Sequence, residues 1–157
     1  MKRVAELLNS MRAAGVVSDY ALFGAAAQMR YTEAVATLDA DVLVKVPDPA
    51  RLDVLAPIYA FCLAQGYTPQ GEAVCVGAWP VQFIPVFNTL TGEAVDRADT
   101  ADFEGIPLRV VGPDYLAVIA LEVGRAKDYA RIIALLDAGS VSDDRIAWAR
   151  FKARFLE

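Results

Sequence analysis

The segment 38–46, with the sequence LDADVLVKV, constrains the fold of this chain more than any other segment. Its valines and its nearly continuous apolar character favour a mostly buried β-strand, which Pro47 ends. Because side chains alternate along a strand, Asp39 and Asp41 are predicted to present their carboxylates on the same face. Two unpaired carboxylates in a buried strand are unfavourable, so we expect a cation to bind them.

The cation that best fits this pair is Mg²⁺ (or Mn²⁺). Magnesium takes oxygen ligands and commonly binds through one or two carboxylates together with water and substrate phosphates. The alternative is that Asp39 and Asp41 lie in water at a frayed start of the strand and bind nothing.

Residue patterns predict the other elements. Apolar spacing indicates a helix over 3–14, and a strand over 19–23 is followed at Gly24 by an alanine-rich helix. Asp48 as N-cap and Pro49 as first helical residue predict a helix running to about Gln65. Two strands joined by a tight turn (74–77 and 80–85), a hairpin (100–111) and three helices (114–122, 126–137 and 142–155) complete the prediction.

These elements indicate an α/β (α+β) fold, with a mixed β-sheet, helices packed on it and a helical C-terminal third. We expect one domain over residues 1–157, with an α/β core over 1–111 and a helical subdomain over 112–157.

Composition excludes several kinds of chemistry. The chain has no histidine, which excludes Ser-His and Cys-His nucleophile pairs and zinc sites that need imidazole. Cys62 and Cys75 lie far apart in apolar surroundings, which is typical of buried thiols in a reducing compartment. Chemistry is therefore expected to depend on carboxylates, lysines and metal.

Charge and hydropathy limit the partners. A net charge of −5 argues against an extended nucleic-acid surface, although a small local contact stays open. No apolar run reaches the roughly 20 residues that cross a bilayer, and polar residues interrupt the N-terminal segment where a signal peptide would be apolar. We expect a soluble, cytoplasmic protein with no membrane partner.

Gly24 and Ala25 stand where a strand turns into a helix, thirteen residues before Asp39. Free backbone N–H groups at such a turn favour an anion such as a triphosphate. A phosphate-binding turn is therefore predicted to face the aspartate pair.

This arrangement resembles the signature of the polymerase-β-type nucleotidyltransferase superfamily, in which a glycine pair or Gly-Ser precedes an acid-hydrophobic-acid-hydrophobic strand. The strand YALFG at 20–24 matches the segment before the glycine, and DADV at 39–42 matches the acidic strand. A second segment, GRAKDYAR at 124–131, preceded by VGPDYL at 111–116, is similar to a helical region of bacterial abortive-infection nucleotidyltransferase toxins.

The resemblance implies a nucleotidyltransferase fold and Mg²⁺-dependent transfer of a nucleoside monophosphate from an NTP to a hydroxyl, on an RNA end or a protein. It implies that Asp39 and Asp41 bind metal and act in catalysis, and that Gly24 and Ala25 bind the nucleotide. Lys127, at the start of a predicted helix, is the best candidate for a cation that reaches the triphosphate. It also implies an antitoxin protein as a possible partner.

Two residues depart from the superfamily pattern. Active members usually supply a third carboxylate from a neighbouring strand, and the matching position here is Gln82, which cannot accept a proton. Glu72 or Glu33 would have to supply the missing carboxylate from a loop. Ala25 replaces a serine hydroxyl, which leaves only the backbone N–H for a phosphate.

Two alternatives therefore stay open. The chain is either an active enzyme in which Gln82 takes part, or a catalytically impaired protein of the same fold that binds a nucleotide or a partner protein. In the same way, Lys127 either binds phosphate or belongs to a solvated helix face on which Asp128 and Arg131 form an exposed pair.

Overall fold

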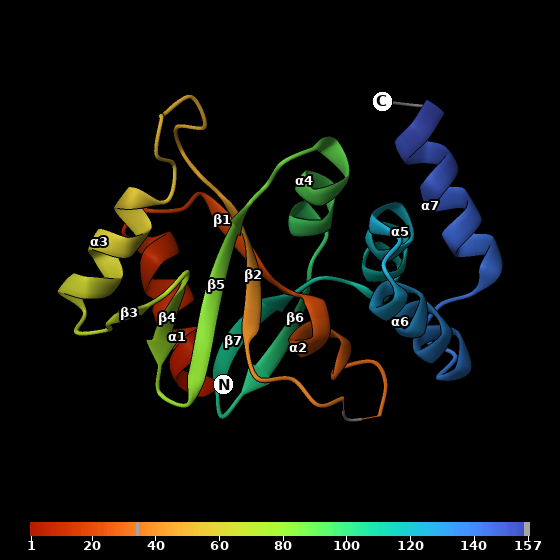
Figure 1. Ribbon diagram of the computed structural model, residues 1–157, viewed down its shortest axis with the longest axis horizontal. Coiled ribbons are helices and arrows are strands. Elements are labelled where there is room, and N and C mark those ends of the chain that lie inside the picture. The colour runs from red at the N-terminus through yellow and green to blue at the C-terminus, as the bar shows by residue number, and fades with distance from the viewer. Residues whose placement is uncertain (34, 156–157) are drawn as a thin grey trace.

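The structure is a computed structural model that describes residues 1–33 and 35–155, with side chains up to residue 150. Over these residues the strands form one mixed seven-stranded sheet in the order β3-β4-β5-β2-β1-β7-β6 (Figure 1). The strands are β1 (Asp19–Phe23), β2 (Ala40–Lys45), β3 (Pro69–Gln70), β4 (Ala73–Val76), β5 (Trp79–Pro85), β6 (Asp99–Phe103) and β7 (Ile106–Val110).

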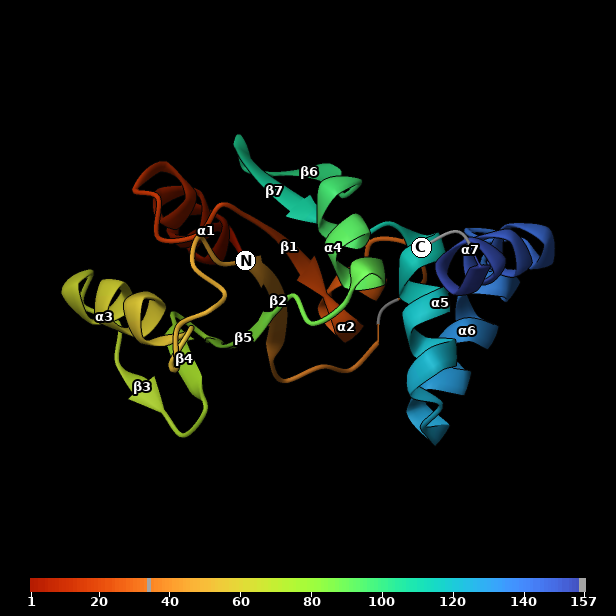
Figure 2. The same cartoon turned by 90° about the horizontal axis from the view of Figure 1, so that it is seen from above.

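Helices cover both faces of this sheet. They are α1 (Lys2–Ala13), α2 (Gly24–Gln28), α3 (Ala56–Ala64), α4 (Thr89–Asp96), α5 (Pro113–Val123), α6 (Ala126–Asp137) and α7 (Asp143–Phe155). The view from above shows α1 and α3 on one side of the sheet and α4 and α5 on the other (Figure 2). The predicted fold class, a mixed sheet with packed helices and a helical C-terminal third, is confirmed.

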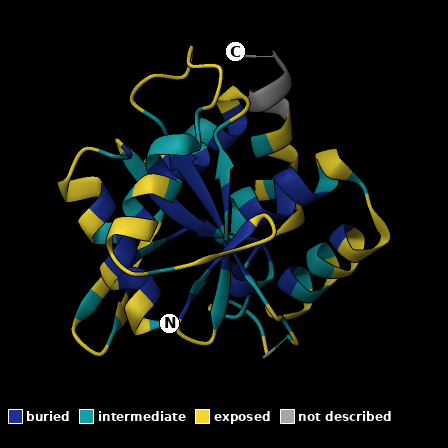
Figure 3. Cartoon of the chain, turned by 60° about the vertical axis from the view of Figure 1, so that its left-hand side comes forward, coloured by how far each residue is buried: buried dark blue, intermediate teal, exposed yellow. Residues whose placement is uncertain are grey.

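β2 lies in the middle of the sheet, between β1 and β5. It pairs antiparallel with β1 and parallel with β5. Val42, Leu43 and Val44 are fully buried, because helices cover the strand on both faces. Figure 3 shows the same pattern for the whole molecule, with buried strands at the centre and exposed residues in loops and on outer helix faces.

The two faces of the sheet can be told apart by single contacts. On β1, Tyr20 donates a hydrogen bond from its hydroxyl to Asn9 of α1 over 2.7 Å, so Tyr20 faces α1. On β2, Lys45 pairs with Asp96 of α4, so the side chains that alternate with it, including that of Asp41, face away from α1.

The predicted start of the helix after Pro47 is wrong. The Asp48 side chain accepts a hydrogen bond from the Ala50 backbone N–H and closes a short turn instead of capping a helix. The helix begins at Ala56, where Asp53 accepts hydrogen bonds from the backbone of Leu55 and Ala56. The N-cap residue is Leu55, which has no capping side chain, so the Asp53 carboxylate supports the turn that leads into the helix.

Two elements were not predicted from the sequence, the two-residue strand β3 and the helix α4. The N-cap of α4 is Asn88, whose side chain accepts a hydrogen bond from the Thr91 backbone N–H over 2.8 Å. Thr91 and Gly92 have low helix propensity, so the sequence did not indicate a helix here. The Asn88 cap stabilises the helix nevertheless.

None of the described helices is long and apolar enough to cross a membrane.

Candidate functional site

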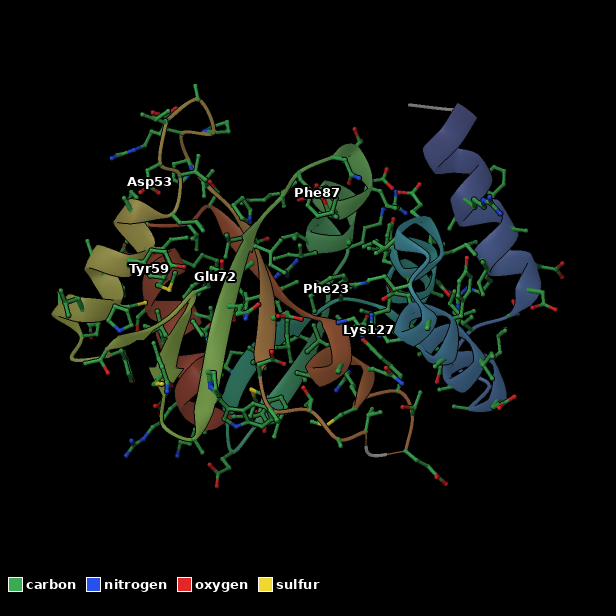
Figure 4. All side chains as sticks on the ribbon, viewed as in Figure 1. Phe23, Asp53, Tyr59, Glu72, Phe87 and Lys127 are labelled. Atoms are coloured by element: carbon green, nitrogen blue, oxygen red, sulfur yellow. The ribbon has the colours of Figure 1, made fainter. Side chains whose placement is uncertain are left out.

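A cleft of about 740 Å³ opens between the end of the central strands, α2 and α6. All six residues singled out from the sequence line it: Gly24, Ala25, Asp39, Asp41, Gln82 and Lys127. The remaining lining residues come from β1, α2, the loop 35–38, β5, and α6 with Arg125 before it. Figure 4 shows Lys127 directed into the space between α6 and the end of β1, where Phe23 lies. The structure therefore brings the predicted residues together, while their roles stay predictions.

The turn between β1 and α2 lies directly against Asp41. Phe23 pairs with Asp41 across the two strands, and Gly24 follows with a positive φ of 64°. A Cβ atom on Gly24 would lie 2.7 Å from Asp41 Oδ2, which is closer than side chains approach. Only glycine meets both conditions at this position.

The predicted helix after Gly24 is present, but it is short. It ends at Gln28 after five residues, so its dipole is small, and any anion bound there would depend mainly on the unpaired backbone N–H groups of its first turn.

The acidic pair is only partly on the strand. Asp41 belongs to β2, whereas Asp39 precedes its first residue, Ala40, which corrects the prediction that both lie on one strand. Thr37 holds the loop there, because its hydroxyl donates to the backbone and carboxylate oxygens of Asp39 over 3.0 and 3.3 Å. Both aspartates nevertheless line the same cleft.

Asp41 lies in a position where its negative charge is disfavoured. Burial, and then the charge of Asp39, raise the pKa of the Asp41 carboxyl, while Lys127, Arg131 and Arg125 lower it. Burial outweighs the cations, so the carboxylate gains from a further positive charge. The alternative of a fully solvated aspartate pair does not hold for Asp41, which is only partly exposed.

Gln82 lies beside Asp41. The parallel register of β2 and β5 aligns the two residues, and both side chains reach the cleft. Among the lining residues, the acids are Asp39 and Asp41 alone. Glu33 and Glu72 are exposed outside the cleft, and Figure 4 shows Glu72 on the α3 side of the molecule, away from Lys127.

One face of α6 forms the wall opposite the sheet. Lys127, Ala130, Arg131 and Ala134 follow helical spacing and all line the cleft. Lys127 is exposed and makes no hydrogen bond or ion pair with the described residues.

The alternative that Asp128 and Arg131 form an exposed pair is wrong. The Asp128 side chain is 1% exposed and that of Arg131 is 11% exposed. Asp128 accepts a hydrogen bond from Arg125 Nε over 2.6 Å and pairs with Arg131 Nη1 over 3.4 Å. The bond from Arg125 holds the pKa of the Asp128 carboxyl below its usual value.

Sequence reasoning missed Gln28, Arg125 and Arg131 as cleft residues. Arg131 Nε donates to Gln28 Oε1 over 3.2 Å, a contact between residues 103 positions apart. Such a contact leaves no mark in local spacing. The sequence offered one signal for Arg131: it follows Lys127 by four residues, which places both on the same face of a helix.

Comparison with known proteins supports the fold. No family profile and no curated protein matches the sequence. Among solved structures, the chain is similar to an antigenic nucleotidyltransferase-like protein from Paracoccidioides brasiliensis, with 14% identity, 93% and 83% of the two chains covered and a TM-score of 0.56.

It is also similar to the antibiotic-resistance factor ANT(2'')-Ia in solution, with 13% identity, 99% and 92% covered and a TM-score of 0.54. The crystal structure of ANT(2'')-Ia with adenylyl-2''-tobramycin is 13% identical in sequence to this chain. The match covers 96% of this chain and 95% of that one, with a TM-score of 0.53. This chain has the polymerase-β-type nucleotidyltransferase fold. The resemblance found in the sequence is confirmed for the fold.

The cleft of this nucleotidyltransferase fold offers oxygen ligands for a divalent cation. Asp39 and Asp41 provide carboxylate oxygens, and Gln82 adds an amide oxygen beside them. No group of three histidine, cysteine, aspartate or glutamate side chains suited to a metal occurs in the described part of the chain. The residues therefore fit an ion that takes its remaining ligands from water and substrate phosphates.

Proposed function

We propose that this chain binds a nucleoside triphosphate with Mg²⁺ (or Mn²⁺) in the cleft and transfers the nucleoside monophosphate to a hydroxyl group. The observation that carries the proposal is the position of Asp39 and Asp41 across one cleft from the cations of α6, beside the Gly24 turn. A metal triphosphate presents both charges, so each wall has a complementary group to bind.

Each residue has a role in this proposal. Asp39 and Asp41 would hold the metal, which supplies positive charge to the phosphates during transfer. The backbone at Gly24 and Ala25, together with the Lys127 ammonium, would bind phosphate oxygens. The acceptor oxygen forms a bond to the α-phosphorus, the bond from that phosphorus to the bridging oxygen breaks, and pyrophosphate leaves.

Gln82 limits the chemistry. Its amide cannot take the proton of the attacking hydroxyl, so another group, such as water or a group of the acceptor, has to take that proton. This observation favours a second candidate function, in which the protein binds the nucleotide, or a partner protein, without turnover. The two candidates share the cleft and differ only in product formation.

The acceptor class is also a proposal. The sequence resemblance points to an RNA end or a protein hydroxyl and to an antitoxin partner. The similar crystal structure of ANT(2'')-Ia holds adenylyl-2''-tobramycin, so a small hydroxyl compound is a further class to test. The net charge of −5 makes a long RNA footprint the least favourable.

Thermal unfolding with each NTP, with and without Mg²⁺ or Mn²⁺, tests binding. Ligand at about 100 times its Kd should add about 2.7 kcal/mol to the free energy of unfolding. The variant carrying both Asp39→Asn and Asp41→Asn should lose the metal-dependent part of this shift. No shift with any NTP at millimolar concentration would end the proposal.

Transfer of label from α-³²P-NTP to RNA, protein or tobramycin separates the two candidates. Labelled product from the natural protein supports the enzyme. Binding without product, together with activity gained in Gln82→Asp, supports a protein that binds but does not turn over.

A further inference from the structure

Arg131 is less exposed than the other two cations that line the cleft, Arg125 and Lys127. Its guanidinium is held from two directions. Nη1 donates to Asp128 Oδ1 over 3.4 Å, and Nε donates to Gln28 Oε1 over 3.2 Å. Because Asp128 belongs to α6 and Gln28 to α2, two separate elements fix one side chain at the cleft wall.

Asp128 is a buried carboxylate that pairs with two arginines. A buried charge is costly unless it is paired, and here Arg125 and Arg131 both pair with it. Both arginines line the cleft. Two guanidinium groups around one carboxylate leave an excess of positive charge facing the space where Asp39 and Asp41 lie.

The contacts of Arg131 leave part of its guanidinium available. Within the described part of the chain, Nη2 of Arg131 donates no hydrogen bond. A guanidinium offers several N–H donors in a rigid plane, which matches the oxygens of a phosphate better than a flexible ammonium does. Since its Nε and Nη1 are already fixed, Arg131 loses little conformational freedom when Nη2 binds an anion.

We propose that Arg131 binds phosphate oxygens of the triphosphate, and that Asp128 and Gln28 are positioning residues for its guanidinium. The inference rests on the proposed function and deepens it. It assigns the stronger phosphate contact to Arg131, which is held in place, and the weaker one to Lys127, which is exposed.

Calorimetric titration of Arg131→Gln, Arg131→Lys and Lys127→Gln tests this assignment, with inorganic tripolyphosphate plus Mn²⁺ and with each NTP plus Mn²⁺ as ligands. Arg131→Gln should weaken binding about tenfold or more, because a hydrogen bond to a charged group is lost. Arg131→Lys keeps the charge and should lie between Arg131→Gln and the natural protein. Lys127→Gln should have the smaller effect.

Binding of Mn²⁺ alone, measured by its electron paramagnetic resonance signal, should not weaken in Arg131→Gln, in contrast to the binding of tripolyphosphate. Loss of a positive charge near Asp41 should leave Mn²⁺ binding unchanged or make it tighter in Arg131→Gln. Arg12→Gln is the matched control, because Arg12 is also paired with an aspartate, Asp19, but lies on α1 outside the cleft. This control should bind every ligand as the natural protein does.

The outcomes separate the two proposals. If the natural protein binds neither tripolyphosphate nor any NTP, the proposed function fails. If it binds them and Arg131→Gln binds them equally well, the proposed function stands and the inference about Arg131 is overturned. If Arg131→Gln weakens the binding of Mn²⁺ and of tripolyphosphate equally, the variant has lost the shape of the cleft, and the inference about Arg131 is also overturned.

The positioning role is tested through coupling. Asp128→Asn and Gln28→Met should each weaken tripolyphosphate binding in the natural background and have little further effect in Arg131→Gln. Asp128 also accepts a hydrogen bond from the Arg125 backbone, so Asp128→Asn risks unfolding α6. Gln28→Met leaves that bond intact, so it still tests the positioning role if Asp128→Asn unfolds α6. Equal effects in both backgrounds would refute positioning.

Discussion

Gly24 brings the backbone of the β1–α2 turn against the carboxylate of Asp41. We predict that Gly24→Ala lowers the free energy of unfolding by more than the roughly 1–2 kcal/mol expected for a left-handed alanine alone, because its Cβ would lie 2.7 Å from Asp41 Oδ2. Displacement of Asp41 should also reduce Mn²⁺ binding. Urea unfolding and metal titration measure the two effects.

The control for this substitution is Gly15→Ala. Gly15 also has a positive φ, 72°, but a Cβ there would meet no atom within 4 Å. It should show the conformational cost alone, with unchanged metal binding. Equal losses of stability in the two variants would contradict the close contact at Gly24.

The raised pKa of Asp41 should make the stability of the protein depend on pH. Burial, and next Asp39, raise the pKa of Asp41 above its usual 3.8, so the folded state holds this proton more tightly than the unfolded state. The contribution of Asp41 to stability therefore falls as the pH rises from 3.8 through the raised value. At pH 7 without metal, Asp41→Asn should be more stable than the natural protein.

Urea unfolding between pH 3 and pH 7 measures this difference, which should vanish below 3.8, where Asp41 is protonated in both states. Saturating Mg²⁺ should reduce the stability difference between Asp41→Asn and the natural protein at pH 7. Glu33→Gln, an exposed carboxylate outside the cleft, is the control and should change little. A less stable Asp41→Asn at pH 7 would show that the cations of α6 outweigh burial.

At the scale of residues, the sequence could predict what depends on alternation and local spacing. The strand pattern placed Asp41 and the turn glycine, and the superfamily resemblance pointed to Gln82 on a neighbouring strand. The arginines could not be placed in this way. Arg131 lies at the cleft and bonds Gln28 of α2 across 103 positions of the sequence, a contact that depends on the whole fold.

At the scale of elements, α4 depends on its cap. We predict that Asn88→Ala lowers the free energy of unfolding by about 1 kcal/mol, because the Thr91 backbone N–H would lose its acceptor. Asn88→Asp keeps an acceptor and should lose much less. Urea unfolding of both variants measures the cap, and equal losses would show that Asn88 acts by some other contact.

Elements with periodic apolar residues were the predictable ones. The apolar spacing of α1 and of α5–α7, and the alternation of the hairpin β6–β7, gave bounds close to those observed. Boundaries that depend on competition between caps were not predictable. Asp48 and Asp53 both accept backbone hydrogen bonds in turns before α3, and the helix begins after the second of these turns, with Leu55 as its N-cap.

At the scale of the whole molecule, the cleft joins the sheet to the C-terminal helices. If metal and NTP bind there, hydrogen exchange should slow together in the segment 35–41 and in α6, while α3 and β3 stay unchanged. Exchange measured by mass spectrometry with NTP and Mn²⁺ checks this. Protection confined to one of the two walls would place the ligand elsewhere.

The fold class was predictable because strands and helices are mixed up to Gly112 and only helices follow. The sheet order was not, since it depends on long-range pairing of β2 with both β1 and β5. That pairing brings Phe23, Asp41 and Gln82 into one row and so determines the floor of the cleft.

The two walls of the cleft come from distant parts of the chain, with Asp41 on β2 and Arg131 on α6. During synthesis the ribosome releases the acidic wall first, and the arginines emerge only after many further residues. Until then Asp41 has no α6 cation to offset its charge. The affinity of a nascent chain for a triphosphate would therefore report that the last helices have docked.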